Sequence, residues 1–172
     1  DGRRLVFLDE SGVNTDMARR YGRARGGARC EGSAPVNTPA PTTVVSSVRL
    51  GGEAVFSTWA GGTTSGRFGD WVREALSPSL RAGDVVVMDN LAAHHARGVG
   101  EALRAAGCEV RYLPPYSPDL NPIEKMWSKV EAALRAASAR TPEALAQAIP
   151  EAIATVTASD CEGWFRSCGY DC

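Results

Sequence analysis

The hydrophobic positions of this chain form short runs at first and helical patterns later. Residues 4–9, 43–50 and 54–59 are short, rich in aliphatic and β-branched side chains and bounded by turn residues, so each predicts a β-strand. Residues 85–88 (VVVM) are an uninterrupted apolar run, which is typical of a strand with both faces buried. Residues 109–113 predict a fifth strand.

Five segments after residue 60 carry apolar residues at helical spacing, and they predict helices over residues 65–80, 97–106, 122–137, 141–155 and 159–167. Ser65 is expected to cap the first helix, and Asn121 the third, which has Pro122 at its first position. The polar, glycine-dotted segment 19–29 is interpreted as a short extra strand and a loop. A strand meander followed by alternating strands and helices indicates a mixed α/β sheet with helices on both faces.

The composition is that of one ordinary globular domain. With 172 residues, 44% of them hydrophobic and 23% charged, the chain can bury a core but is too short for several domains. No run approaches the roughly 20 apolar residues that cross a bilayer, and the first residues lack a signal-peptide pattern. Five irregularly spaced cysteines predict free thiols in the cytoplasm and argue against a disulfide-stabilised secreted protein.

The net charge of −1 is not that of a typical nucleic-acid-binding domain, which is usually strongly basic. Positive charge is nevertheless concentrated in residues 3–29, which hold seven arginines and only three acids. Guanidinium groups suit phosphate oxygens, so Arg19 and Arg20 are candidates for DNA contact. A solvated surface in an arginine-rich protein is the simpler interpretation, and composition alone favours it.

Three acids occupy positions suited to chemistry. Asp9 ends the first predicted strand, Asp89 directly follows the apolar strand, and Glu124 lies in the first turn of a helix. In α/β sheets, functional groups gather at the carboxyl ends of strands. Clustered carboxylates repel one another, and divalent cations relieve that repulsion; ligands that are all oxygen suit Mg²⁺ or Mn²⁺. The three acids together therefore predict a metal site.

Each acid also has a purely structural interpretation. Asp9 could stabilise a turn in the sequence DESG, and Asp89 with Asn90 could form a turn after a strand. Glu124 lies three residues after Asn121, the spacing of a helix-capping pair. Only the combination of two strand-end acids with one helical acid favours the metal site.

Three motifs, in order, resemble the catalytic domain of bacterial insertion-sequence transposases of the mariner superfamily. They are LVFLDESGVNTDMARRYGRA from residue 5, GDVVVMDNLAAHH from residue 83 and LPPYSPDLNPIEKMW from residue 113. The family's Asp, Asp, Glu triad falls on Asp9, Asp89 and Glu124. The 34 residues between the last two match the interval typical of this superfamily.

The resemblance implies a ribonuclease H-like fold with a mixed five-stranded sheet flanked by helices. It implies a DNA endonuclease and strand transferase that uses two Mg²⁺ or Mn²⁺ ions to cut transposon ends and join them to target DNA. The implied partners are DNA and, as a homodimer, a second copy of the chain, and the implied location is the bacterial cytoplasm at the nucleoid. Residues 1–172 would form the catalytic domain, without the family's N-terminal helix-turn-helix region.

Residues beside the triad are expected to help to bind DNA. Asn90, His94 and Asn121 are candidates for phosphate contact, although His94 could equally be a surface residue at a helix start. Trp127 and Val130 have the spacing of core positions on the same helix as Glu124.

Two other functions remain open. Another nuclease of the same fold, such as a ribonuclease H or a junction resolvase, would share the metal chemistry but not the sequence SPDLNPIE. An inactive or repurposed transposase fragment could bind DNA or a protein without cutting, although its acids would have no reason to persist.

Overall fold

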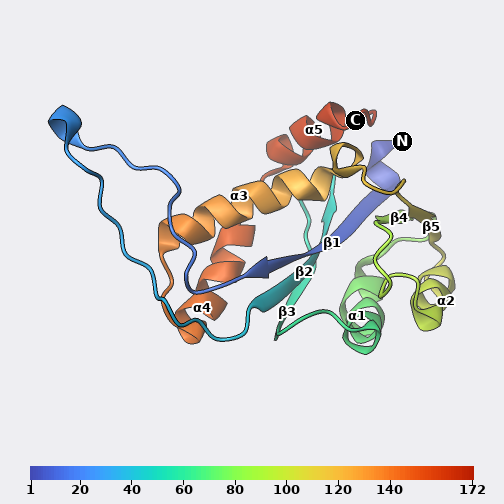
Figure 1. Cartoon of the computed structure of the whole chain (residues 1–172). Coiled ribbons are helices and arrows are strands. Elements are labelled where there is room, and N and C mark those ends of the chain that lie inside the picture. Colours follow the sequence, from blue (N-terminus) through green and yellow to red (C-terminus); the bar gives the residue numbers. More distant parts are fainter.

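A five-stranded mixed sheet forms the centre of the computed structural model, which describes all of residues 1–172 (Figure 1). The strands are β1 (Leu5–Val13), β2 (Thr42–Arg49), β3 (Phe56–Ala60), β4 (Val85–Met88) and β5 (Glu109–Tyr112). Their order in the sheet is β3-β2-β1-β4-β5. The meander β1–β2–β3 is antiparallel, whereas β4 and β5 join parallel to β1. The predicted fold class is confirmed.

Strand β1 is longer than the sequence predicts. It passes through Asp9 and continues to Val13, so the expectation that Asp9 ends the strand is wrong. The reason is that β2 supports the extension, with Ser11 opposite Val44 and Val13 opposite Thr42. The parallel neighbour β4 stops at Met88, so beyond that point one edge of β1 lacks a strand partner.

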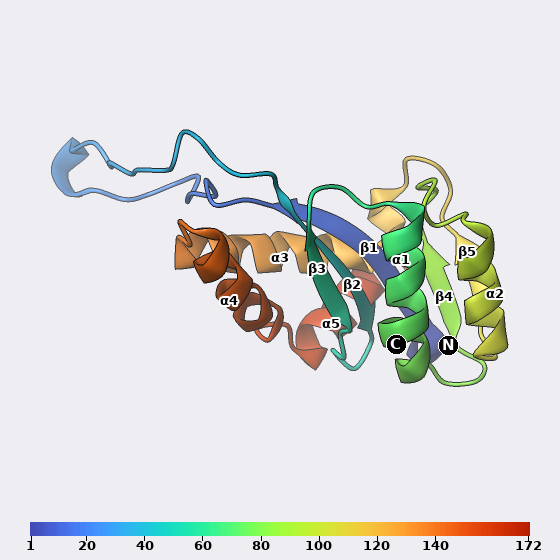
Figure 2. The same cartoon turned by 90° about the horizontal axis from the view of Figure 1, so that it is seen from below.

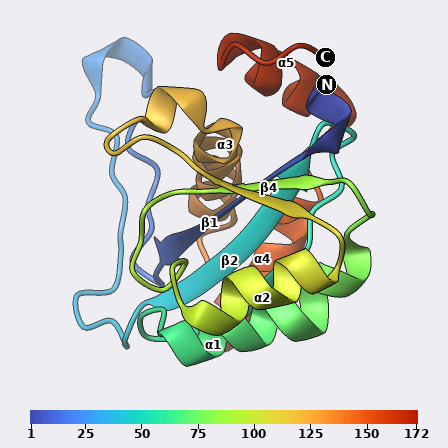
Figure 3. The ribbon, with the colours of Figure 1, turned by 90° about the vertical axis from the view of Figure 1, so that its right-hand side faces the viewer.

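Helices cover both faces of the sheet, as Figure 3 shows. They are α1 (Ser65–Trp71), α2 (Arg97–Ala105), α3 (Pro122–Ala137), α4 (Pro142–Ile153) and α5 (Ala158–Ser167). The predicted helix over residues 65–80 is α1 followed by a π-helical turn and a 3₁₀ turn, and Thr64 rather than Ser65 caps it. No helix is long and apolar enough to cross a membrane.

The alternation of side chains along the strands divides the core in two. Phe7 and Val87 face α3, α4 and α5, whereas Val6, Leu8 and Val86 face α1 and α2. Strand β4 therefore contributes to both cores, as its unbroken apolar run predicts. The predicted core positions on α3 are confirmed, since both are buried against the first of these cores.

The segment between β1 and β2 projects from the body as a long arm, residues 14–41 (Figure 2). It contains one 3₁₀ turn, Arg25–Gly27, and no strand, so the extra strand predicted within 19–29 is absent. The arm's polar residues have no sheet edge beside them to pair with. Its base is fixed by Arg140, which donates hydrogen bonds to the carbonyls of Thr15, Met17 and Ser33.

A buried ion pair stabilises the end of the sheet away from the arm. Arg49 Nη2 lies 2.6 Å from Asp84 Oδ2, and both side chains are almost inaccessible to solvent. Asp84→Asn is expected to lower the free energy of unfolding by about 3 kcal/mol, because it strands a buried guanidinium without its counter-charge. Urea denaturation measures the loss. The control Asp70→Asn removes an exposed ion pair with Arg73 and should cost less than about 0.5 kcal/mol; equal losses would contradict the account.

Candidate active site

The parallel pairing of β1 with β4 brings the first two predicted acids together. Phe7 is opposite Val87, so continuing the register by two residues sets Asp9 beside Asp89. Asp9 shares the β1 face of Phe7 and Ser11, and the Ser11 hydroxyl donates to Glu131 of α3. Asp9 therefore faces the helix that carries the third acid.

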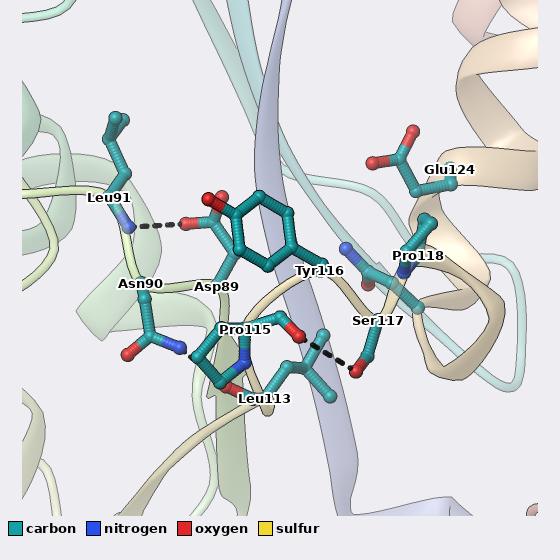
Figure 4. Close-up of a pocket in the computed structure, with 10 residues that line it drawn as sticks. Asp89, Asn90, Leu91, Leu113, Pro115, Tyr116, Ser117, Pro118 and Glu124 are labelled. Atoms are coloured by element: carbon teal, nitrogen blue, oxygen red, sulfur yellow. Dashed lines mark hydrogen bonds between the residues drawn. The ribbon is translucent and has the colours of Figure 1, made fainter.

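Asp89 and Glu124 line one pocket of about 460 Å³. In Figure 4 the two carboxylates stand on either side of the opening, with the ring of Tyr116 between them in the view. The other lining residues come from the loop after β4 and from the loop that leads into α3. The structure thus places two acids of the predicted triad, Asp89 and Glu124, on the pocket and the third, Asp9, on the adjacent strand.

The loop between β5 and α3 positions Glu124. It contains Pro115 and Pro118, whose rings fix backbone angles, and Tyr116 has a left-handed φ of 56° with a fully exposed side chain. The end of the loop is anchored because the Tyr170 hydroxyl donates to the carbonyl of Leu120 at 2.7 Å. Because its prolines restrict the backbone and its end is anchored, the loop fixes the first turn of α3, and with it Glu124, at the pocket.

Asn121 does not cap α3 with its side chain. It occupies the N-cap position, but only its backbone forms hydrogen bonds: its N–H donates to the Pro118 carbonyl and its carbonyl accepts from the Glu124 N–H, both at 3.1 Å. The expected side-chain cap is therefore wrong, and so is the interpretation of Glu124 as half of a capping pair. The Asn121 side chain is buried and its Oδ1 has no hydrogen-bond partner. Glu124 is left exposed and free to face the pocket.

Burial, and after it the charges of neighbouring acids, raises the pKa of both Asp9 and Glu124. Burial raises the pKa of Asp9 to about 7, against a hydrogen bond from the Glu10 N–H, with further increases from the charges of Glu124 and Asp89. Burial and the charges of Asp89 and Glu131 also raise the pKa of Glu124. The three carboxylates therefore share one electrostatic environment, in which a cation would be stabilising.

In contrast to Asp9 and Glu124, Asp89 has a lowered pKa, because a histidine favours its ionised form. His94 Nδ1 lies 2.7 Å from Asp89 Oδ1, and His94 Nε2 lies 2.9 Å from Glu10 Oε2. The hydrogen bond from His94 lowers the pKa of Asp89. Burial lowers the pKa of His94, but its bonds to the two carboxylates outweigh burial and raise it to about 9. The imidazole is therefore charged at neutral pH and donates from both nitrogens.

The expectation that His94 contacts DNA is wrong, because its side chain is fully buried and both ring nitrogens are occupied. Sequence reasoning also missed Glu10, its second partner. The signal available was the residue order DE in a strand, which places Glu10 on the face opposite Asp9.

The other predicted DNA contacts are placed at two sites. Asn90 is exposed beside the pocket, and its amide donates to the carbonyl of Leu113, which ties the loop after β4 to the end of β5. Asn121 lines the pocket from a buried position. Arg19 and Arg20 are exposed at the base of the arm, around a second cavity of about 640 Å³.

The three carboxylates are the kind of ligand that a divalent cation prefers, but they lie too far apart in this structure to coordinate one together. No group of three His, Cys, Asp or Glu side chains stands in metal-binding geometry. The donors are nevertheless all carboxylate oxygens, two of the acids line one pocket, and the unfavourable ionisation of Asp9 on the adjacent strand is the kind that a cation reverses. We conclude that the set fits Mg²⁺ or Mn²⁺ after a local approach of the acids.

Residues 4–146 match the family model described as DDE superfamily endonuclease. This covers most of the chain, and the chain belongs to that family. A search of curated proteins finds no match.

Solved structures share the ribonuclease H-like fold. The Mos1 transposase paired-end complex with the left transposon end superimposes with a TM-score of 0.73 at 22% identity, over 96% of this chain and 51% of that one. The Mos1 strand transfer complex gives 0.67 at 20% identity, over 97% and 51%. The Mos1 mariner paired end complex with Mn gives 0.65 at 20%, over 96% and 51%. The chain thus spans about half the length of these proteins.

Proposed function

We propose that residues 1–172 form the catalytic domain of a transposase, which cuts DNA strands at transposon ends and transfers them into target DNA. The observation that carries the proposal is the placement of Asp89 and Glu124 on one pocket of a DDE-family fold, with Asp9 on the adjacent strand and close enough for their charges to raise its pKa. The similar Mos1 structures are named as complexes of a transposase with transposon ends, which supports the same class of substrate here.

The three acids would hold two divalent ions, Mg²⁺ or Mn²⁺. When bound, such ions polarise the scissile phosphate and stabilise the attacking and leaving oxygens. Asp9, Asp89 and Glu124 would each supply carboxylate oxygens to these ions. Asp9 must lose its proton for this role, so a cation is expected to pull its pKa below the value of about 7 found without one.

DNA is the proposed partner, and we infer that the protein acts as a homodimer on paired ends, which the resemblance implies. The pocket beside Asn90 opens to solvent, so a phosphate can approach the acids there. The arginines at the base of the arm offer a second point of contact with the backbone of the duplex.

A cleavage assay tests the proposal. Plasmid and short duplex DNA are incubated with the protein in Mg²⁺, in Mn²⁺ or in EDTA, with Glu124→Gln in parallel. The proposal predicts nicking that needs metal and disappears in the variant, which keeps the shape of the side chain but not its charge. Nicking in EDTA, or equal nicking by Glu124→Gln, would contradict it.

The arm makes a separate prediction about binding. Replacing Arg19 and Arg20 together with Ala is expected to weaken DNA binding by roughly tenfold and to reduce the salt dependence by about two counterions. Fluorescence anisotropy at several salt concentrations measures both. The control is Arg104→Ala, which removes an exposed arginine from α2, outside the pocket and the arm. If both proteins bind alike, the arm is a solvated surface and not a DNA contact.

A further inference from the structure

A chain of hydrogen bonds connects the almost inaccessible Glu10, the fully buried His94 and the half-exposed Asp89. The two hydrogen bonds of His94 join a residue of β1 to the residue that follows β4, and Glu10 is 84 residues away from His94 in sequence. A buried imidazole needs a hydrogen-bond partner for each of its ring nitrogens. Both nitrogens of His94 have a carboxylate partner, although Glu10 Oε1 is buried without one, so the fold itself sets the position of the ring.

The chain lies on the face of the sheet opposite Asp9. Glu10 follows Val6 and Leu8 along β1, on the side covered by α1 and α2, and its side chain is almost inaccessible. His94 packs against Phe68 of α1, with ring centroids 4.5 Å apart. The carbonyl of His94 accepts from the Tyr112 hydroxyl at the end of β5. The imidazole is therefore held by β1 and α1, and the backbone of His94 is held by the end of β5.

The contacts engage only one oxygen of Asp89. Oδ1 accepts from His94 Nδ1 and from the Leu91 N–H at 2.9 Å, while Oδ2 takes part in no hydrogen bond of the structure. A carboxylate held in this way cannot rotate freely, and its second oxygen has no competing partner on a residue that lines the pocket. Positioning partners of this kind orient metal-binding groups in many proteins.

We propose that Glu10 and His94 are positioning residues that fix Asp89 with Oδ2 free to bind the divalent ion of the active site. His94 restrains the carboxylate, and Glu10 restrains His94 from the far side, so the β1 strand that carries Asp9 also sets the orientation of Asp89. The inference rests on the proposed function, because it assigns these residues to the same metal site.

The test is the affinity for Mn²⁺, measured by calorimetric titration with MnCl₂ on the whole chain. His94→Phe keeps the aromatic packing on Phe68 and removes both hydrogen bonds, and it is expected to weaken binding by roughly 10- to 100-fold. His94→Asn, which keeps a donor near the position of Nδ1, is expected to recover most of that loss. The matched control is His95→Phe, because His95 is exposed, stacks on Tyr112 and makes no bond to Asp89. It should leave the affinity within about twofold, a change too small to reflect a lost ligand restraint.

Two further variants make the outcomes distinct. Asp89→Asn marks the affinity that remains without the ligand itself, and Glu10→Gln weakens the restraint without changing its shape. Thermal unfolding shows whether His94→Phe folds. If it does not, Glu10→Gln still tests the positioning role. If wild type and Asp89→Asn bind Mn²⁺ equally, or neither binds, the proposed function falls and this inference with it. If Asp89→Asn loses binding while folded His94→Phe and Glu10→Gln match His95→Phe, only the positioning role is overturned.

Discussion

Asp89→Asn is expected to lower the rate of metal-dependent strand cleavage at least about 1,000-fold, which corresponds to about 4 kcal/mol of transition-state stabilisation. The substitution replaces one carboxylate oxygen with an amide and removes the negative charge that a cation needs. Asp89 sits after β4 with half of its side chain exposed, so the change leaves the two cores intact. His94 loses one of its two carboxylate partners in this variant, so the free energy of unfolding is expected to fall, and cleavage is compared under conditions where both proteins are folded.

Single-turnover cleavage measures the rate, and urea denaturation verifies the fold. Asp119→Asn is the matched control, because Asp119 is an exposed acid in the loop before α3 that does not line the pocket. It should cut at the wild-type rate. Wild-type cleavage by Asp89→Asn would remove this residue from the metal site.

Asp9→Asn is expected to stabilise the metal-free protein at pH 8 by about 2–4 kcal/mol and to have little effect at pH 4. The pKa of Asp9 is raised from 3.8 to about 7 in the folded chain, so folding favours the protonated form. Stability from this group is present below the unfolded pKa and is lost as the pH rises through about 7. Asparagine resembles the protonated acid and avoids that loss.

Urea denaturation in EDTA at pH 4 and pH 8 measures the difference between the two proteins. His94 shifts the wild-type curve in the same direction, because its pKa is raised to about 9 and its contribution is lost between pH 6.5 and that value. Comparing the two proteins isolates Asp9, since both contain His94. A difference that is equal at the two pH values would contradict the raised pKa of Asp9. Mg²⁺ at pH 8 should stabilise the wild type and not the variant.

The sequence predicts the frame of the site well, for physical reasons that act locally. The run Val85–Met88 has no polar residue, is rich in β-branched valine and is too short for a helix, so it predicts a strand covered on both faces with the following acid at its carboxyl end. Pro122 removes a backbone donor that a helix start does not need, which marks where α3 begins.

Features that depend on distant pairing are not predictable in this way. The continuation of β1 beyond Asp9 depends on β2, which begins about 30 residues later, after the arm. The burial of His94 depends on Glu10 and on Phe68, which belong to separate elements. In the sequence alone, His94 beside His95 has the pattern of a surface residue at a helix start. Only the fold distinguishes the two histidines: the His94 ring enters the core, whereas the His95 ring stacks on Tyr112 at the surface.

The central claim is that Asp9, Asp89 and Glu124 form one metal site. The most direct measurement is a crystal structure of the protein grown with MnCl₂, with anomalous scattering recorded near the manganese edge. The account predicts anomalous peaks within about 2.5 Å of oxygens of all three acids, with Glu124 drawn toward the other two and Asp89 bound through Oδ2. Peaks elsewhere on the protein, with these carboxylates apart as they are without metal, would contradict it.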